Sequence, residues 1–349
     1  MKKKHVPTLY EAKCLMSKID PTYNLYCGQI TKKEMEILRL DEKRHVPTVP
    51  YNTLITEIFN YVEEVILKGD TPFEKRIIVI NKTGEVYNSN NYSILIPQDL
   101  IKDLGPLSNV EIMIKVTRVF VDKVNDEVIT LIKRQIANGD AKVVDSNLKN
   151  NKIEKTSVFV DGYMINDNLL KQPLRNTLHH ELTHVYDEYI SLSKFKEGND
   201  VYNQLVDMGY FRILQMCQSQ DEITKKFANL LYRFYTPTEM NAMLSQLYSE
   251  MQQFTPDKNR IWDYLRRTNV WKRYEEGRET FNWLKSLNDF SKWKEWMGLI
   301  GIGGMSPQDF KMQLIEILDY NFRDFIRRLG GTATLWLDEN CEYKTNIIF

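Results

Sequence analysis

Apolar residues between Leu54 and Ile66 recur at intervals of three and four positions, and Gly69 follows them. This spacing places apolar side chains on one face of a helix, and a glycine is a common helix stop. The pattern predicts an amphipathic helix after a polar, irregular N-terminal segment at residues 1–50. The first patterned element of the chain is therefore a helix.

Runs rich in β-branched residues come next and are typical of short strands. A Lys82-Thr83-Gly84 turn separates the first two runs. The predicted strands are RIIVI at 76–80, EVY at 85–87, SILI at 93–96, EIMIKVTRVFV at 111–121 and SVFVDGYMI at 157–165. A helix is expected around 128–136, and the polar stretch 146–156 is expected to be an exposed loop.

Helical spacing returns after Pro173 and then dominates the chain. The β signal almost disappears beyond residue 200, and Gly-rich stretches at 298–304 and 330–331 interrupt the helical pattern. We expect an α+β fold: a mixed-sheet lobe over residues 51–195 and a mainly helical lobe over 196–349.

Charge and composition exclude several classes of partner. Lys plus Arg and Asp plus Glu both number 47, so no net field favours nucleic acid. The tryptophans between 262 and 296 alternate with acidic as well as basic residues, which favours helix packing over single-strand binding. No window approaches the roughly 18 consecutive apolar residues of a membrane span, and no signal peptide is evident. We therefore expect a cytoplasmic protein that binds neither nucleic acid nor membrane.

The strongest chemical signal is the motif His180-Glu181-Leu182-Thr183-His184. On a helix, residues four apart lie on one face, so the imidazoles of His180 and His184 can direct nitrogens at one zinc ion. Glu181 is rotated about 100° from His180 and can reach a water in the open coordination position. The four cysteines form no CxxC pair, so a thiolate zinc site is not expected.

The window Thr177 to Tyr186 resembles the longer signature of zincin metallopeptidases. This resemblance implies a zincin-like mixed sheet, with the strand at 157–165 as an antiparallel edge strand that binds extended substrate over Val158 to Tyr163. Metzincins have Gly and His where this chain has Asp187 and Ile190, which excludes that subclass.

In gluzincins a Glu from a later helix, often followed by a small residue three positions on, supplies the third ligand. Glu239-Met240-Asn241-Ala242 fits this pattern, so the resemblance implies Glu239 as the third ligand. Thr236-Pro237-Thr238-Glu239 is also a capping box, in which Glu239 would only satisfy backbone donors. The other carboxylates considered for this role are Glu222, Asp221 and Glu250, and Tyr232 or Tyr235 are considered for polarising an intermediate.

The leading hypothesis is a zinc-dependent, gluzincin-like metallopeptidase that hydrolyses peptide bonds of a peptide or protein substrate by metal-activated water. Its ligands would be His180, His184 and Glu239, and Glu181 would be the general base. The alternative is a zincin-fold structural or interaction protein within a large assembly, for example a component of a phage particle. A zinc ion that only staples two lobes would need a fourth protein ligand, and the sequence offers no clear one.

Overall fold

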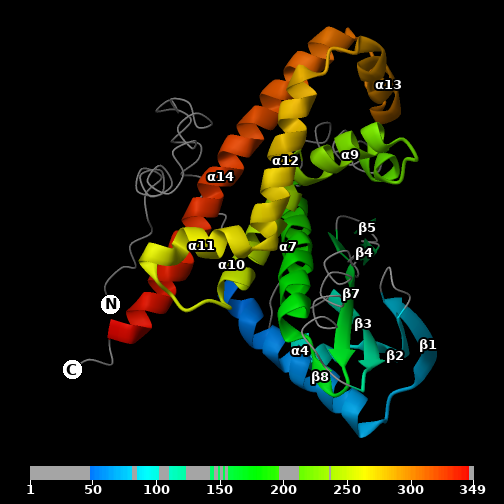
Figure 1. Cartoon of the computed structure of the whole chain (residues 1–349), viewed down its shortest axis with the longest axis vertical. Helices are drawn as coiled ribbons and strands as arrows, with labels where there is room; N and C mark the ends of the chain where they lie inside the picture. The colour runs from blue at the N-terminus through cyan, green and yellow to red at the C-terminus, as the bar shows by residue number, and fades with distance from the viewer. Residues whose placement is uncertain are drawn as a thin grey trace. The chain divides into compact units, whose positions relative to one another are not determined.

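The chain folds as two compact units, a sheet unit at Val46–Lys194 and a helical unit within Phe195–Phe349 (Figure 1). The structure is a computed structural model. It describes residues 48–80, 85–101, 110–122, 142–144, 148–149, 152–153, 156–195, 212–235 and 237–345. The helix expected around 128–136 lies outside these residues.

The sheet unit is built on a six-stranded mixed sheet. Its strands follow the order β1-β2-β3-β7-β4, and β8 pairs with β7. All neighbours are antiparallel except β3 and β7, which are parallel. The strands are β1 (Phe73–Ile80), β2 (Glu85–Leu95), β3 (Val110–Phe120), β4 (Lys142–Val144), β7 (Thr156–Ile165) and β8 (Asn168–Leu169). The mixed sheet that the sequence predicts is confirmed.

Two details of the strand predictions are wrong. The stretch 146–156, expected to be a loop, contains the small hairpin of β5 (Leu148–Lys149) and β6 (Lys152–Ile153) and the first residue of β7. Strand β7 is also not a sheet edge, because residues 157–159 pair with β4 and residues 164–165 pair with β8. The pairing of β7 with β3 joins segments far apart in sequence, which local patterns do not reveal.

Among its described residues, the sheet unit has the helices α4 (Thr48–Lys68), α5 (Gln98–Ile101) and α7 (Lys171–Phe195). Helix α7 contributes Leu174, Leu178 and Leu182 to the same core as the strands, at spacings of four residues. Gly162 on β7 lies below this helix, and a β-carbon there would contact Leu174 at 3.5 Å. This is an ordinary van der Waals distance, and the buried leucine face fixes which side of α7 is turned away from the sheet.

Contacts between α7 and α4 hold the start of α7 in place. Lys171 Nζ lies 2.8 Å from a carboxylate oxygen of Glu63. The Arg175 guanidinium lies over the ring of Phe59, 5.2 Å from its centroid. The helix that carries the histidine motif is therefore anchored to both the sheet and α4.

The helical unit is organised around aromatic side chains. Phe227 stacks on Trp296 with ring centroids 3.9 Å apart, and the Trp296 indole nitrogen donates to Thr224 Oγ1 at 3.0 Å. The helices are α9 (Glu222–Phe234), α10 (Pro237–Met251), α11 (Ile261–Arg267), α12 (Asn269–Ser286), α13 (Phe290–Ile300) and α14 (Pro307–Thr345), with a short 3-10 turn η2 (Lys258–Arg260) before α11. Trp271 and Trp293 are also buried, so the packing role expected of this tryptophan-rich stretch is confirmed.

The two glycine-rich stretches behave differently. Gly301 ends α13 with a φ of 85°, so residues 301–304 form the expected turn between helices, while residues 298–300 are still helical. Residues 330–331 lie inside α14, which continues without a break, so the expected interruption there is wrong. Leu329 and Ala333 on either side are buried, and their packing sustains the helix through the two glycines. Within the residues described, no helix has the length and apolarity to cross a membrane.

Candidate metal centre

Helix α7 brings His180 and His184 together on one face. Their Nε2 atoms lie 3.2 Å apart, and their ring centroids are 4.9 Å apart with ring planes at 78°. Both side chains are partly exposed, whereas their neighbours Leu178 and Leu182 are fully buried. The leucines face the core, so the histidines occupy the outer side of the helix.

The spacing of the two Nε2 atoms suits a shared zinc ion. Two nitrogens about 2.0–2.1 Å from a tetrahedral zinc ion lie about 3.3 Å apart. The Nε2 atoms of His180 and His184 are 3.2 Å apart, which is close to this expected nitrogen–nitrogen distance. The same distance also accommodates a hydrogen bond between two neutral rings of opposite tautomer. Two neutral imidazoles on adjacent turns are the donor set that zinc prefers, and therefore fit this ion.

His179, directly before the motif, and Glu181, within it, are both buried. His179 is fully buried, and burial, followed by the charge of Arg175, lowers its pKa to about 3. Its carbonyl oxygen accepts a hydrogen bond from Thr183 Oγ1 at 2.7 Å. Glu181 is 5% exposed. His179 is thus a neutral core residue, while Glu181 carries the motif's carboxylate next to His180.

Glu239 lies in the first turn of α10, in the helical unit, and is 2% exposed. Glu239 can offer a carboxylate oxygen to a metal ion, and His180 and His184 of the sheet unit can each offer a ring nitrogen. Helix α10 begins at Pro237, which agrees with the predicted helix start. Thr236, the other half of the predicted capping box, lies outside the described residues.

The other carboxylates considered as third ligands have evident local roles. Asp221 caps α9 and forms an ion pair with Lys292 at 2.7 Å, and these hydrogen bonds hold its pKa well below the usual range. The Glu222 side chain is 83% exposed. Glu250 accepts a hydrogen bond from the backbone nitrogen of Asn269 at 2.7 Å. Tyr232 and Tyr235, considered for polarising an intermediate, pack against the helical core.

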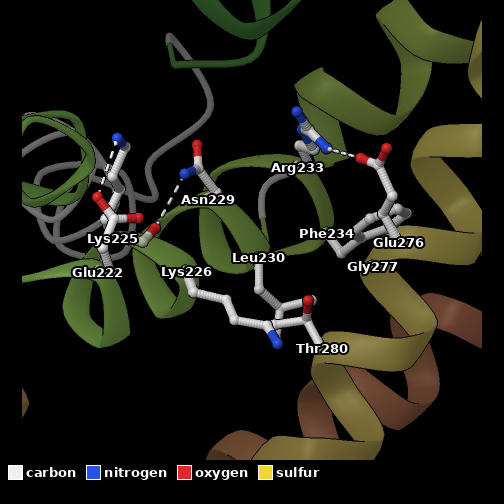
Figure 2. Close-up of a pocket in the computed structure, with 10 residues that line it drawn as sticks. All are labelled: Glu222, Lys225, Lys226, Asn229, Leu230, Arg233, Phe234, Glu276, Gly277 and Thr280. Carbon is white, nitrogen blue, oxygen red and sulfur yellow. Dashed lines mark hydrogen bonds and ion pairs between the residues drawn. The ribbon is translucent and has the colours of Figure 1, made fainter.

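The helical unit also has a pocket of about 390 Å³ between α9 and α12 (Figure 2). Its charged side chains pair locally: Lys225 lies 3.6 Å from Glu222, and Arg233 lies 3.2 Å from Glu276. Asn229 donates to the carbonyl oxygen of Lys225 at 2.9 Å. These local pairs account for the charged side chains of the pocket. We therefore interpret the pocket as a gap where two helices pack against each other.

Sequence reasoning considered Glu250 only as a metal ligand and missed its hydrogen bond with Gln246 on α10. Gln246 and Glu250 lie on the same face of α10 as Glu239, and Arg273 of α12 donates to Gln246 at 3.2 Å. A signal was present, since polar residues four positions apart, such as Gln246 and Glu250, lie on one face of a helix and can bond to each other. The partner on α12 could not be found from local spacing.

Comparison with known proteins adds no relative to these observations. The chain matches no protein-family model, no curated protein and no solved structure.

Proposed function

We propose that this protein is a zinc-dependent metallopeptidase of the gluzincin type, with a peptide or protein as its substrate. His180, His184 and Glu239 are the proposed ligands, and Glu181 is the proposed general base. The observation that carries the proposal is the 3.2 Å separation of the His180 and His184 Nε2 atoms on a helix with the HExxH motif. Both imidazoles lie on the side of α7 opposite its buried leucines, and their spacing matches that of two nitrogens bound to one zinc ion.

The donor set supports an ion with an open coordination position. Two imidazoles and one carboxylate are three protein ligands, which is the number typical of catalytic rather than structural zinc. When bound, zinc supplies Lewis-acid chemistry, lowering the pKa of water towards 7 and polarising a carbonyl oxygen. Glu239 is the proposed carboxylate because Asp221, Glu222 and Glu250 have the local roles described above.

Glu181 supplies the proton transfers in this proposal. Its carboxylate follows His180 directly in α7 and is shielded from solvent. In peptide hydrolysis the carboxylate accepts the proton of the attacking water and then delivers it to the nitrogen of the leaving amine. The C–N bond breaks as the nitrogen is protonated, so one residue serves first as base and then as acid.

The experiment compares the wild type with Glu181→Gln. Zinc content is measured by mass spectrometry of the metal after dialysis, and cleavage is measured on a mixed peptide library. We expect one zinc per chain in both proteins and a fall in turnover of at least 100-fold in the variant, since general acid–base catalysis contributes about 10²–10⁴-fold. The matched control is Glu57→Gln, an exposed glutamate of α4, which should cleave like the wild type.

Two results would contradict the proposal in different ways. If the wild type binds no zinc, the proposed metal site is wrong. If the wild type binds zinc but cleaves no peptide, the metal site stands and the peptidase activity is wrong. That result favours the structural role in a large assembly. Equal turnover in wild type and Glu181→Gln removes the assignment of the general base.

A further inference from the structure

Three arginines around α11 have no acidic partner among the described residues. Arg260, Arg266 and Arg267 are exposed, and their guanidinium groups form no hydrogen bond or ion pair with the part of the chain that the structure describes. By contrast, the exposed Arg76 of the sheet unit pairs with Glu74 at 2.8 Å. Within the described structure, nothing uses the N–H donors of the three guanidinium groups.

The three arginines lie on one side of α11. The residues of this helix that are buried in the helical core are Ile261, Tyr264 and Leu265. At 100° per residue, positions 260, 266 and 267 fall within about 120° on the other side of the helix axis, and they span about 10 Å along it. We call these three residues the arginine face.

Aromatic rings hold two of these arginines in place. Arg266 Cζ lies 4.3 Å from the centroid of the Trp262 ring, and Arg260 Cζ lies 5.3 Å from that of Tyr264. Trp262 itself meets the buried Trp271 edge-on, with ring centroids 4.8 Å apart. A guanidinium over a ring keeps its five N–H donors, because the ring interacts with the charge and not with these hydrogens. The rings therefore position the two charges and leave their donors for a ligand.

The charge of the arginine face is only partly balanced. Residues 260–267 contain three arginines and one acid, Asp263, which is also exposed. Within the described structure, Asp263 forms no ion pair with any of the three arginines. Like charges on one short helix repel each other, and a bound anion relieves this repulsion. The arginine face is therefore suited to an anionic partner.

We propose that the arginine face is a docking site for an acidic segment of another protein, rich in aspartate or glutamate. A carboxylate matches the fork of a guanidinium with two parallel hydrogen bonds. Partly exposed Trp262 adds an aromatic surface for an apolar side chain of the same segment. This inference goes beyond the proposed function and does not depend on zinc.

The size of the face favours a protein segment over a nucleic acid. Its length of about 10 Å accommodates a few carboxylates, whereas a nucleic-acid strand is usually held by a longer run of cations. Asp263 lies among the three arginines and would repel a continuous phosphate backbone. The separated carboxylates of a peptide can bind on either side of it.

The test measures binding of a deca-glutamate peptide to the full chain by titration calorimetry at low salt. The variant carries Arg260→Gln, Arg266→Gln and Arg267→Gln together. We expect it to bind the peptide about 10-fold more weakly or worse, because three exposed ion pairs are lost. In the opposite direction, Asp263→Asn removes a repelling carboxylate and should bind about 2- to 5-fold more tightly. All four positions are exposed, so these variants should fold.

A charge-matched control separates the arginine face from net charge. It carries Lys225→Gln, Lys285→Gln and Arg323→Gln, which remove the same charge from cations that have carboxylate partners. The control should bind the peptide like the wild type. Equal weakening in the control and in the arginine variant would overturn the inference, because net charge alone would then explain binding.

Three further outcomes also decide the matter. No binding of the peptide by the wild type, or equal affinity in the wild type and the arginine variant, overturns the inference. Tighter binding of a deca-thymidylate than of the peptide overturns it in favour of a nucleic acid. Peptide affinity should be unchanged after zinc is removed with a chelator. A chain that binds the peptide but no zinc therefore contradicts the proposed function alone.

Discussion

Gly277 of α12 lies directly against the ring of Phe234, so that a β-carbon at position 277 would come within 2.2 Å of Phe234 Cε2. Phe234 is fully buried and stacks on Phe322 with ring centroids 4.4 Å apart. It also meets Phe325 edge-on at 5.6 Å. The ring cannot move without disturbing its aromatic neighbours, so the absence of a side chain at 277 sets how closely α9 and α12 approach.

The substitution Gly277→Ala should therefore destabilise the helical unit. Overpacking of a core costs about 1–3 kcal/mol, and the better helix propensity of alanine offsets at most about 1 kcal/mol of it. Urea unfolding followed by circular dichroism measures the difference. Gly298→Ala is the control, because nothing lies within 4 Å of a β-carbon there, and it should be neutral or stabilising. A stability for Gly277→Ala equal to that of Gly298→Ala would contradict the packing argument.

Trp296→Phe should lower the stability of the same unit. The change removes the indole nitrogen that donates to Thr224 Oγ1 at 3.0 Å and leaves a gap beside Phe227. Together the lost hydrogen bond and the lost packing should cost about 2–3 kcal/mol. The same substitution at Trp262, which packs at the periphery of the core, should have a smaller effect on the urea midpoint. The reverse order of the two effects would argue against Trp296 as a central core residue.

Glu250→Gln should change how stability depends on pH. Burial raises the pKa of Glu250 above its ordinary 4.5, while hydrogen bonds from Gln246 and the α12 backbone act in the opposite direction. The folded state therefore holds this proton more tightly than the unfolded state. Ionisation of Glu250 therefore lowers the free energy of unfolding increasingly as pH rises from 4.5 through the folded-state pKa.

Relative to the wild type, Glu250→Gln should thus become more stable as pH rises from about 4.5 to 7. Unfolding free energies measured at several pH values in this range give the slope. Glu275→Gln, at an exposed position of α12, should leave the slope unchanged. A difference between wild type and Glu250→Gln that is constant over this pH range would refute the raised pKa.

Zinc should stabilise the wild type but not variants that lack a ligand imidazole. A ligand that binds only the folded state at 100 times its dissociation constant adds about 2.7 kcal/mol of stability. The melting temperature should therefore rise with zinc in the wild type and remain constant in His180→Gln and His184→Gln. Magnesium serves as the ionic control, because imidazole is a poor ligand for it. A zinc-dependent rise in His184→Gln equal to that of the wild type would exclude this histidine as a ligand.

The features predicted correctly from the sequence are those set by local spacing. The histidine pair of α7 is an i, i+4 relationship, and the leucines at 174, 178 and 182 fix which face of the helix is buried. The same is true of α4 and of the strand at 157–165. Glu239 was chosen from a pattern of neighbours in sequence, and its role as a ligand stays a prediction.

The features missed depend on contacts between distant segments. The position of β7 inside the sheet follows from its parallel pairing with β3. The contact of Arg273 with Gln246 joins two helices. The glycines at 330 and 331 were misread because buried side chains on both sides stabilise α14 more than two glycines weaken it.

The parallel pairing of β3 with β7 has a consequence for the order of folding. Strands β1 and β2 are neighbours in the chain and pair as a hairpin, but Ile114 pairs with Val160, which lies far along the sequence. Closing such a long loop carries an entropy penalty that a hairpin avoids, so this pairing should be the slow step of the sheet unit. The core leucines of α7 have a surface to pack on only once β7 is in place. The histidine pair should therefore reach its final position late in folding, and zinc should bind after that step rather than nucleate it.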